Sequence, residues 1–133
     1  MQRQDIDRQG SAIILARALA KRLQDVVPSG IQVLSRGGDV VVSDGRTSDG
    51  TSLVPLVDQP GDVEDNLVTA ASAVLNTVQD FATESLRSPW PAAAGKELVL
   101  PTALVEGGIL RLCFGGPATP VLELEPISLV DLF

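Results

Sequence analysis

The chain has 133 residues, of which 44% are hydrophobic and 20% are charged, and its net charge is −7. It contains no histidine, no tyrosine and a single cysteine, Cys113. The lack of imidazole and of a second thiol excludes the commonest general bases, metal-ligand clusters and an intrachain disulfide. The acidic balance and the scarcity of aromatic residues argue against binding to nucleic acids or anionic lipids. This length and apolar content fit one globular domain, residues 1–133, with an aliphatic core.

The first half of the chain predicts one helix followed by a β-hairpin. Apolar residues recur every three or four positions between residues 11 and 27, which is the period of a helix with one buried face. Ile6 keeps the same phase, but Gly10 weakens an earlier start. Gly37-Gly38 favours a hairpin turn, because tight turns need positive φ. The predicted elements are a polar segment at 1–10, a helix at 11–27, strands at 31–35 and 39–43, a loop at 44–52 and, at best, an edge strand at 53–57.

The second half repeats this plan. Asp62 is suited to cap a helix that reaches about Arg87, and Pro89-Trp90-Pro91 ends it. Gly107-Gly108 predicts a second hairpin turn. The remaining predicted segments are a linker at 92–95, strands at 97–100, 103–106, 109–114 and 121–125, a turn at 115–120 and an apolar C-terminal tail at 126–133.

Both halves therefore have the order α-β-β-β. Identity between them is little more than the glycines and one leucine, so they are interpreted either as an internal repeat or as two ordinary hairpins that each follow a helix. In both cases the predicted class is α+β. We expect an antiparallel sheet of five or six strands with two helices packed on one face.

Cys113 is the first candidate for chemistry. In a strand, alternation places Leu110, Leu112 and Phe114 on one face and Arg111 with Cys113 on the other. A neighbouring arginine lowers the pKa of a thiol and raises its reactivity. Because no histidine is present to act as a base, we interpret Cys113 as a small, half-buried core residue.

Acidic residues give weaker signals. Asp39, Asp44 and Asp49 are spaced by five residues, which does not fit the alternate ligands and final Glu of an EF-hand loop, so we predict a solvated loop. Glu84 and Glu106 are the carboxylates that an enzyme or small-molecule site beside the sheet would use. We assign no catalytic, cofactor-binding or metal-binding residue.

Trp90 and the C-terminal tail are the candidates for binding a partner. A tryptophan between two prolines either plugs the end of the core or anchors a partner. The sheet face opposite Leu110 also carries apolar residues, and a large apolar face is seldom left in water. We therefore expect the tail to dock onto this chain or onto a second subunit. The candidate partner-binding residues are Trp90, Ile127, Leu129, Leu132 and Phe133.

Several short motifs carry a resemblance. Gln79-Asp80, Glu84, Pro89-Trp90-Pro91 and the run from Pro120 to Ile127 resemble small uncharacterised proteins of actinobacteria. That resemblance covers about the second half of the chain and implies no activity. The order of elements is also similar to the secretion-chaperone-like fold, a likeness of topology alone that implies a protein-binding role.

Together these features predict a non-catalytic protein-interaction module of the chaperone or adaptor type that self-associates as a homodimer and uses no cofactor. The polar first ten residues lack an apolar stretch of signal-peptide length, so we expect a cytoplasmic location. The alternative is a small-molecule-binding protein or enzyme that uses a carboxylate in a pocket beside the sheet. A buried, unpaired carboxylate in a deep apolar pocket would favour that alternative.

Overall fold

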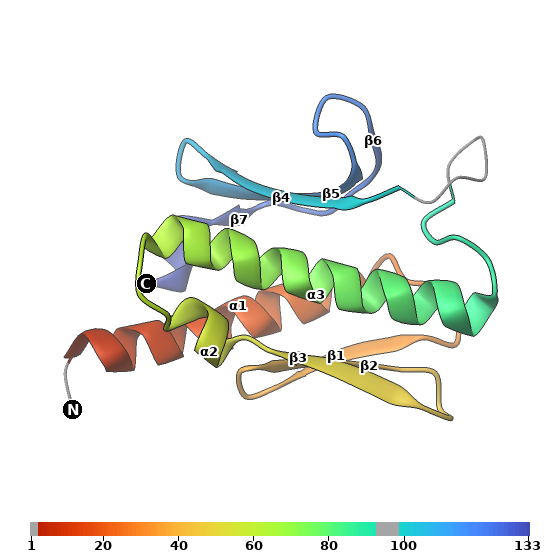
Figure 1. Cartoon of the computed structure of the whole chain (residues 1–133), viewed down its shortest axis with the longest axis horizontal. Helices are drawn as coiled ribbons and strands as arrows, with labels where there is room; N and C mark the ends of the chain where they lie inside the picture. The colour runs from red at the N-terminus through yellow and green to blue at the C-terminus, as the bar shows by residue number, and fades with distance from the viewer. Residues whose placement is uncertain (1–2, 93–98) are drawn as a thin grey trace.

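The computed structural model describes residues 3–92 and 99–133. It confirms the α+β class with antiparallel strands. The strands form two sheets rather than the single predicted one, and Figure 1 shows these sheets on opposite sides of the two long helices. The strands are divided because each half of the chain folds its own strands after its own helix, three in the first half and four in the second.

The helices are α1 (Arg3–Gln24), α2 (Val54–Val57), α3 (Val63–Leu86) and the 3-10 helix η1 (Leu129–Leu132). The strands are β1 (Gln32–Arg36), β2 (Asp39–Ser43), β3 (Ser48–Ser52), β4 (Pro101–Glu106), β5 (Ile109–Gly115), β6 (Pro120–Glu123) and β7 (Ile127–Ser128). One sheet has the order β1-β2-β3 and the other the order β4-β5-β6, with β7 also paired to β5. Gly37 (φ 61°) and Gly107 (φ 59°) lie in the turns between the paired strands, so both predicted hairpins are confirmed.

The first sheet turns a valine-rich face toward the helices. Val33 pairs with Val42 across β1 and β2, and Val40 pairs with Thr51 across β2 and β3. Directly paired residues lie on the same face of a sheet, and all three valines are buried. The hydroxyls of Thr51 and Thr77 lie 2.7 Å apart and join β3 to α3.

Both ends of α3 are fixed as the sequence predicts. The carboxylate of Asp62 accepts hydrogen bonds from the backbone N–H groups of Glu64 (2.7 Å) and Asp65 (3.2 Å). Arg87 ends the helix in the left-handed conformation. Beyond it, the buried Trp90 packs edge-on against Phe114 of the second sheet, with ring centroids 5.2 Å apart.

The second sheet alternates as predicted. Leu110, Leu112 and Phe114 of β5 are buried on the helix side. On the outer face, the guanidinium of Arg111 donates a hydrogen bond to the carbonyl oxygen of Pro117 at 3.3 Å. Figure 1 shows the loop between β5 and β6 curled away from the helices, on that same outer side.

The C-terminal tail docks against its own chain. β7 pairs with the start of β5, and the Ser11 hydroxyl of α1 donates to the carbonyl oxygen of Leu132 at 2.7 Å. Three turns further along α1, the guanidinium of Arg22 donates to the carbonyl oxygens of Glu125 (2.7 Å) and Pro126 (3.2 Å). The tail therefore connects the first helix to the second sheet, and one core of buried aliphatic residues is built from both halves of the chain.

Several sequence-based boundaries and element types were wrong. α1 begins at Arg3 instead of residue 11 and passes through Gly10. Residues 48–52 form β3 instead of a loop, and segment 53–57 holds the helix α2 instead of an edge strand. The linker predicted at 92–95 and the strand start predicted at 97 fall largely on residues 93–98, outside the described residues. No described helix is long and apolar enough to span a bilayer.

Candidate functional site

Two recesses at opposite ends of α3 are the main candidates for a functional site. The polar recess, about 450 Å³ in volume, lies at the C-terminal end of α3 and is lined by Asp44, Arg46, Thr47, Ser48, Asp49, Phe81, Glu84, Ser85 and Arg87. The C-terminal groove, about 710 Å³ in volume, lies at the N-terminal end of α3 and is lined by Val63, Glu64, Gly108, Leu129, Val130 and Phe133. The two recesses differ in chemistry, and this difference bears on the two functions that the sequence leaves open: a protein-interaction module, and a small-molecule-binding protein or enzyme.

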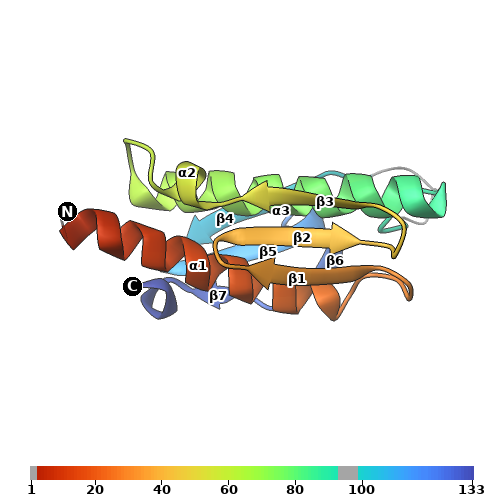
Figure 2. The ribbon, with the colours of Figure 1, turned by 90° about the horizontal axis from the view of Figure 1, so that it is seen from below.

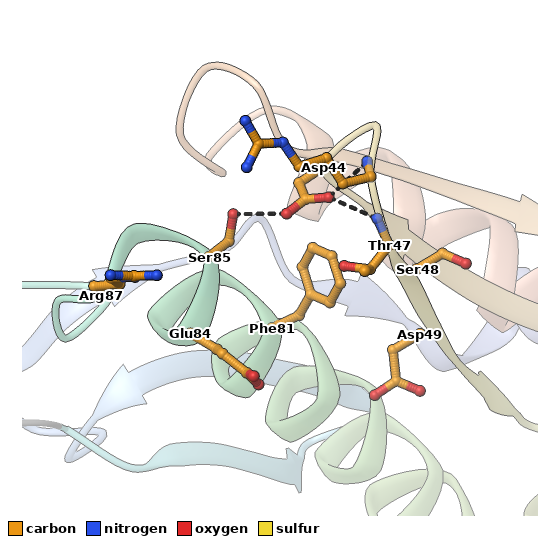
Figure 3. Close-up of a pocket in the computed structure, with 9 residues that line it drawn as sticks. Asp44, Thr47, Ser48, Asp49, Phe81, Glu84, Ser85 and Arg87 are labelled. Carbon is orange, nitrogen blue, oxygen red and sulfur yellow. Dashed lines mark hydrogen bonds between the residues drawn. The ribbon is translucent and has the colours of Figure 1, made fainter.

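The hydrogen bonds of one aspartate, Asp44, connect the elements that line the polar recess. Figure 3 shows Asp44 facing Ser85 above the ring of Phe81, whereas Glu84 and Arg87 point elsewhere. The carboxylate of Asp44 accepts hydrogen bonds from the backbone N–H groups of Arg46 and Thr47, both at 2.9 Å, and from the Ser85 hydroxyl at 3.0 Å. These bonds close the turn between β2 and β3 and attach it to α3.

This hydrogen bonding sets the charge of the recess. The backbone N–H of Thr47, and next that of Arg46, lowers the pKa of the Asp44 carboxyl below its ordinary value. Asp44 is therefore an anion near neutral pH, and its lowered pKa makes it a weak base. Glu84, the carboxylate that the sequence singled out here, is exposed to solvent. The recess is thus polar and solvated, which is not the buried carboxylate in an apolar pocket that would favour an enzyme.

The other candidate groups for chemistry lie on the outer face of the second sheet. Arg111 forms ion pairs with Glu123 (3.4 Å) and with the exposed Glu106 (3.8 Å). Cys113 is only 3% exposed, and burial raises the pKa of its thiol more than the charge of Arg111 lowers it. The thiol is therefore protonated near neutral pH, which makes it a poor nucleophile. Among the described residues, no group of three or more His, Cys, Asp or Glu side chains is placed to hold a metal ion.

The C-terminal groove is apolar and is built by the tail. The backbone N–H of Leu129 donates to the carbonyl oxygen of Gly108 at 2.9 Å, which fixes η1 beside the hairpin turn of the second sheet. Leu129 and Leu132 point into the core, while Val130 is 78% exposed and Phe133 is 65% exposed. The helical spacing of η1 therefore divides the tail into an anchored side and a solvent-facing apolar side.

Acidic side chains lie at this groove and in the elements beside it. Glu64 lines it, and the exposed Asp131 lies between the two exposed apolar residues of the tail. Asp62 and Asp65, in the first turn of α3, are also exposed. An apolar surface with an acidic border is complementary to a segment that carries both apolar and basic residues.

The five candidate partner-binding residues are not brought together. Trp90 lies beyond the C-terminal end of α3, and the four tail residues lie near its N-terminal end. Trp90, Ile127, Leu129 and Leu132 are buried in this chain's own core, and Phe133 remains exposed. Val63 and Val130, which complete the groove, were not singled out from the sequence. The exposure of Val130 depends on the turn of η1, which the sequence of the seven-residue tail does not reveal.

Comparison with known proteins adds no relative. No protein-family model matches the sequence, and neither a curated protein nor a solved structure resembles it above the level expected by chance. Function is therefore inferred from the two recesses themselves.

Proposed function

We propose that this protein is a non-catalytic protein-interaction module of the chaperone or adaptor type, and that the C-terminal groove binds an apolar, basic segment of another protein. The observation that carries this proposal is the pair of exposed apolar side chains, Val130 and Phe133, on a tail that is otherwise anchored in the core. Exposed aromatic and aliphatic side chains beside a groove are typical of binding anchors.

Charge supports a foreign partner over a second copy at this groove. Two copies that met here would oppose the carboxylates of Glu64 and Asp131 to those of the other copy, and like charges across an interface cost affinity. The net charge of −7 likewise favours a basic partner and disfavours nucleic acid. The cytoplasmic location expected from the sequence is compatible with such a role.

The test uses the unfolded chains of two proteins whose native folds are related and whose charges are opposite. Reduced lysozyme with its thiols blocked by iodoacetamide is a basic unfolded probe, and α-lactalbumin treated in the same way is an acidic one. We expect fluorescence anisotropy to show binding of the lysozyme chain that weakens with added salt, and much weaker binding of the lactalbumin chain. The double substitution Val130→Asp with Phe133→Asp should abolish binding.

Leu100→Asp is the matched control, because Leu100 is 71% exposed but does not line the groove. It should bind like the parent protein. Equal binding of the lysozyme chain by the tail variant and the parent would overturn the proposal. Failure of the parent to bind the lysozyme chain would overturn it as well. Sedimentation of the parent over a range of concentrations would show whether a second copy occupies the groove instead.

A further inference from the structure

The edge strands of the two sheets differ in whether side chains of this chain occupy their outward backbone N–H groups. An edge strand presents unpaired backbone N–H and C=O groups that invite another strand. On β1, the outward N–H of Val33 donates to the side-chain oxygen of Gln24 at 2.7 Å. On β3, the N–H of Gly50 donates to the carboxylate of Asp49 at 2.8 Å. Side chains of the protein itself thus occupy one outward donor on each edge of the first sheet.

Among residues 3–92 and 99–133, no side chain occupies an outward donor on the edge of β4 in this way. The N–H of Gly115 donates to the carbonyl oxygen of Leu100 at 2.8 Å, which sets the phase of the ladder between β4 and β5. In an antiparallel pair, every second residue bonds to the neighbouring strand, so the backbone groups of Ala103 and Val105 point away from β5. Within the described residues, these groups make no other hydrogen bond.

Other features also leave this edge open. Pro101 falls on an outward position, where its missing N–H costs no bond to β5. The four residues from Thr102 to Val105 carry no charge, and all are half-buried. Charged side chains that commonly protect an edge are therefore absent from the part of β4 that presents free backbone groups.

A second copy of the chain does not fit this edge. Figures 1 and 2 show α3 running beneath β4, and the side chain of Gln79 in α3 donates to the carbonyl oxygen of Val99 just before β4. Antiparallel pairing of two β4 strands would place both α3 helices on the same side of the joined sheet. Paired strands lie about 4.8 Å apart, whereas packed helices need about 8–10 Å. The two helices would overlap.

We infer that β4 accepts an extended segment of the partner protein as an added antiparallel strand, which continues toward the C-terminal groove. A bare extended segment has no helix beneath it, so it avoids the overlap that excludes a second copy. Gly108, in the turn that follows β4, lines the groove, and Glu64 lies at the start of the helix beneath β4. One bound segment thus pairs its backbone with Ala103 and Val105 and places apolar and basic side chains at the groove.

This inference rests on the proposed function. Amide hydrogen exchange on the parent protein distinguishes binding through an added strand from binding at the groove alone. With the blocked lysozyme chain at about ten times its Kd, exchange at Ala103 and Val105 should slow about tenfold, because it then proceeds through the unbound fraction. Exchange at Thr102 and Leu104, whose N–H groups already bond to β5, should change little. Contact by side chains alone would not produce this alternation.

Proline substitution provides a second test. Ala103→Pro removes an outward donor that the sheet does not use, and it should weaken binding of the lysozyme chain about three- to tenfold. Ser35→Pro is the matched control, because it removes an outward donor from the edge of β1; circular dichroism confirms that each variant folds. Binding without alternating protection overturns the added strand and leaves the proposed function standing. Absence of binding overturns both, and protection that rises with protein concentration alone assigns the edge to a second copy.

Discussion

Asp44 connects two elements of the structure through the hydrogen bonds of a single side chain. Its carboxylate joins the turn between β2 and β3 to Ser85 near the end of α3. The lowered pKa of Asp44 means that the folded protein binds this proton less tightly than the unfolded chain does. The ionised carboxylate therefore stabilises the fold above the ordinary aspartate pKa, and this stabilisation is lost as the pH falls through the folded-state value.

We expect Asp44→Asn to lower the melting temperature at pH 7. The difference from the parent should shrink as the pH falls below the ordinary aspartate pKa of about 3.9, and it should disappear once the pH lies below the folded-state value. Ser85→Ala should have a smaller effect, because the backbone N–H groups of Thr47 and Arg46 outweigh the serine as causes of the lowered pKa. Thermal unfolding from pH 2 to pH 7 measures both differences. A constant difference between Asp44→Asn and the parent across this range would contradict a role for the charge.

At the scale of the elements, α1 is longer than its sequence predicts. Gly10 lies inside the helix, and a Cβ atom added there would have no neighbour within 4 Å. Glycine in a helix interior costs stability because its unfolded backbone is unusually free. The packing of the following turns onto the core offsets this cost, so the helix continues through a residue that weakens it locally.

Gly10→Ala should therefore stabilise the protein by about 0.5–1 kcal/mol. Gly30→Ala is the contrasting substitution, since Gly30 has equal space around it but a φ of 95°, and it should destabilise the protein. Urea unfolding of the two variants and the parent measures these changes. Loss of stability in Gly10→Ala would mean that α1 does not pass through residue 10 in solution.

The elements that the sequence failed to predict share a physical cause. β3 is polar throughout, so no alternation of apolar residues marks it, and it is held by backbone pairing to β2. Leu53, which caps α2, and Val57 at its end are buried one turn apart, and Pro55 occupies the first turn of the helix, where proline is favoured. Periodic helices and glycine-pair hairpins were predictable because their signals are local; these short elements depend on neighbours distant in the sequence.

At the scale of the whole molecule, the helices form a layer that both sheets share. Figures 1 and 2 show that each sheet has one face on this layer and one face turned away from it. On the second sheet, the ion pair of Arg111 and Glu123 lies on the face turned away from the helices. The sequence predicts the buried faces of the strands from alternation, but it does not predict how many sheets they form, since that depends on which strands pair.

The same limit applies to the candidate site. The apolar character of the tail is visible in the sequence. Glu84, which the sequence suggests for a pocket beside the sheet, lies exposed in the lining of the polar recess. The division of the tail into buried Leu132 and exposed Phe133 follows from η1 and from its hydrogen bond to Ser11, more than a hundred residues away in the chain. Long-range contacts of this kind leave no periodic signal in a single sequence.

The C-terminal tail packs against both halves of the molecule. Its buried side and its exposed side should respond differently to mutation. Leu132→Ala should cost about 2–5 kcal/mol of unfolding free energy, because it leaves a cavity at a position that is 1% exposed. Val130→Ala, on the exposed side of η1, should change stability by no more than about 0.5 kcal/mol. Urea unfolding measures both values.

Deletion of residues 127–133 extends this comparison to the whole tail. It removes the buried side chains of Ile127, Leu129 and Leu132, each of which contributes about 1.5–3 kcal/mol when fully buried, together with the hydrogen bond from Ser11. The truncated chain should therefore unfold at a much lower urea concentration than either point variant. If instead it unfolded together with the Val130→Ala protein, the tail would not be bound to the core in solution. The groove that it forms with α3 would then be lost as a binding site.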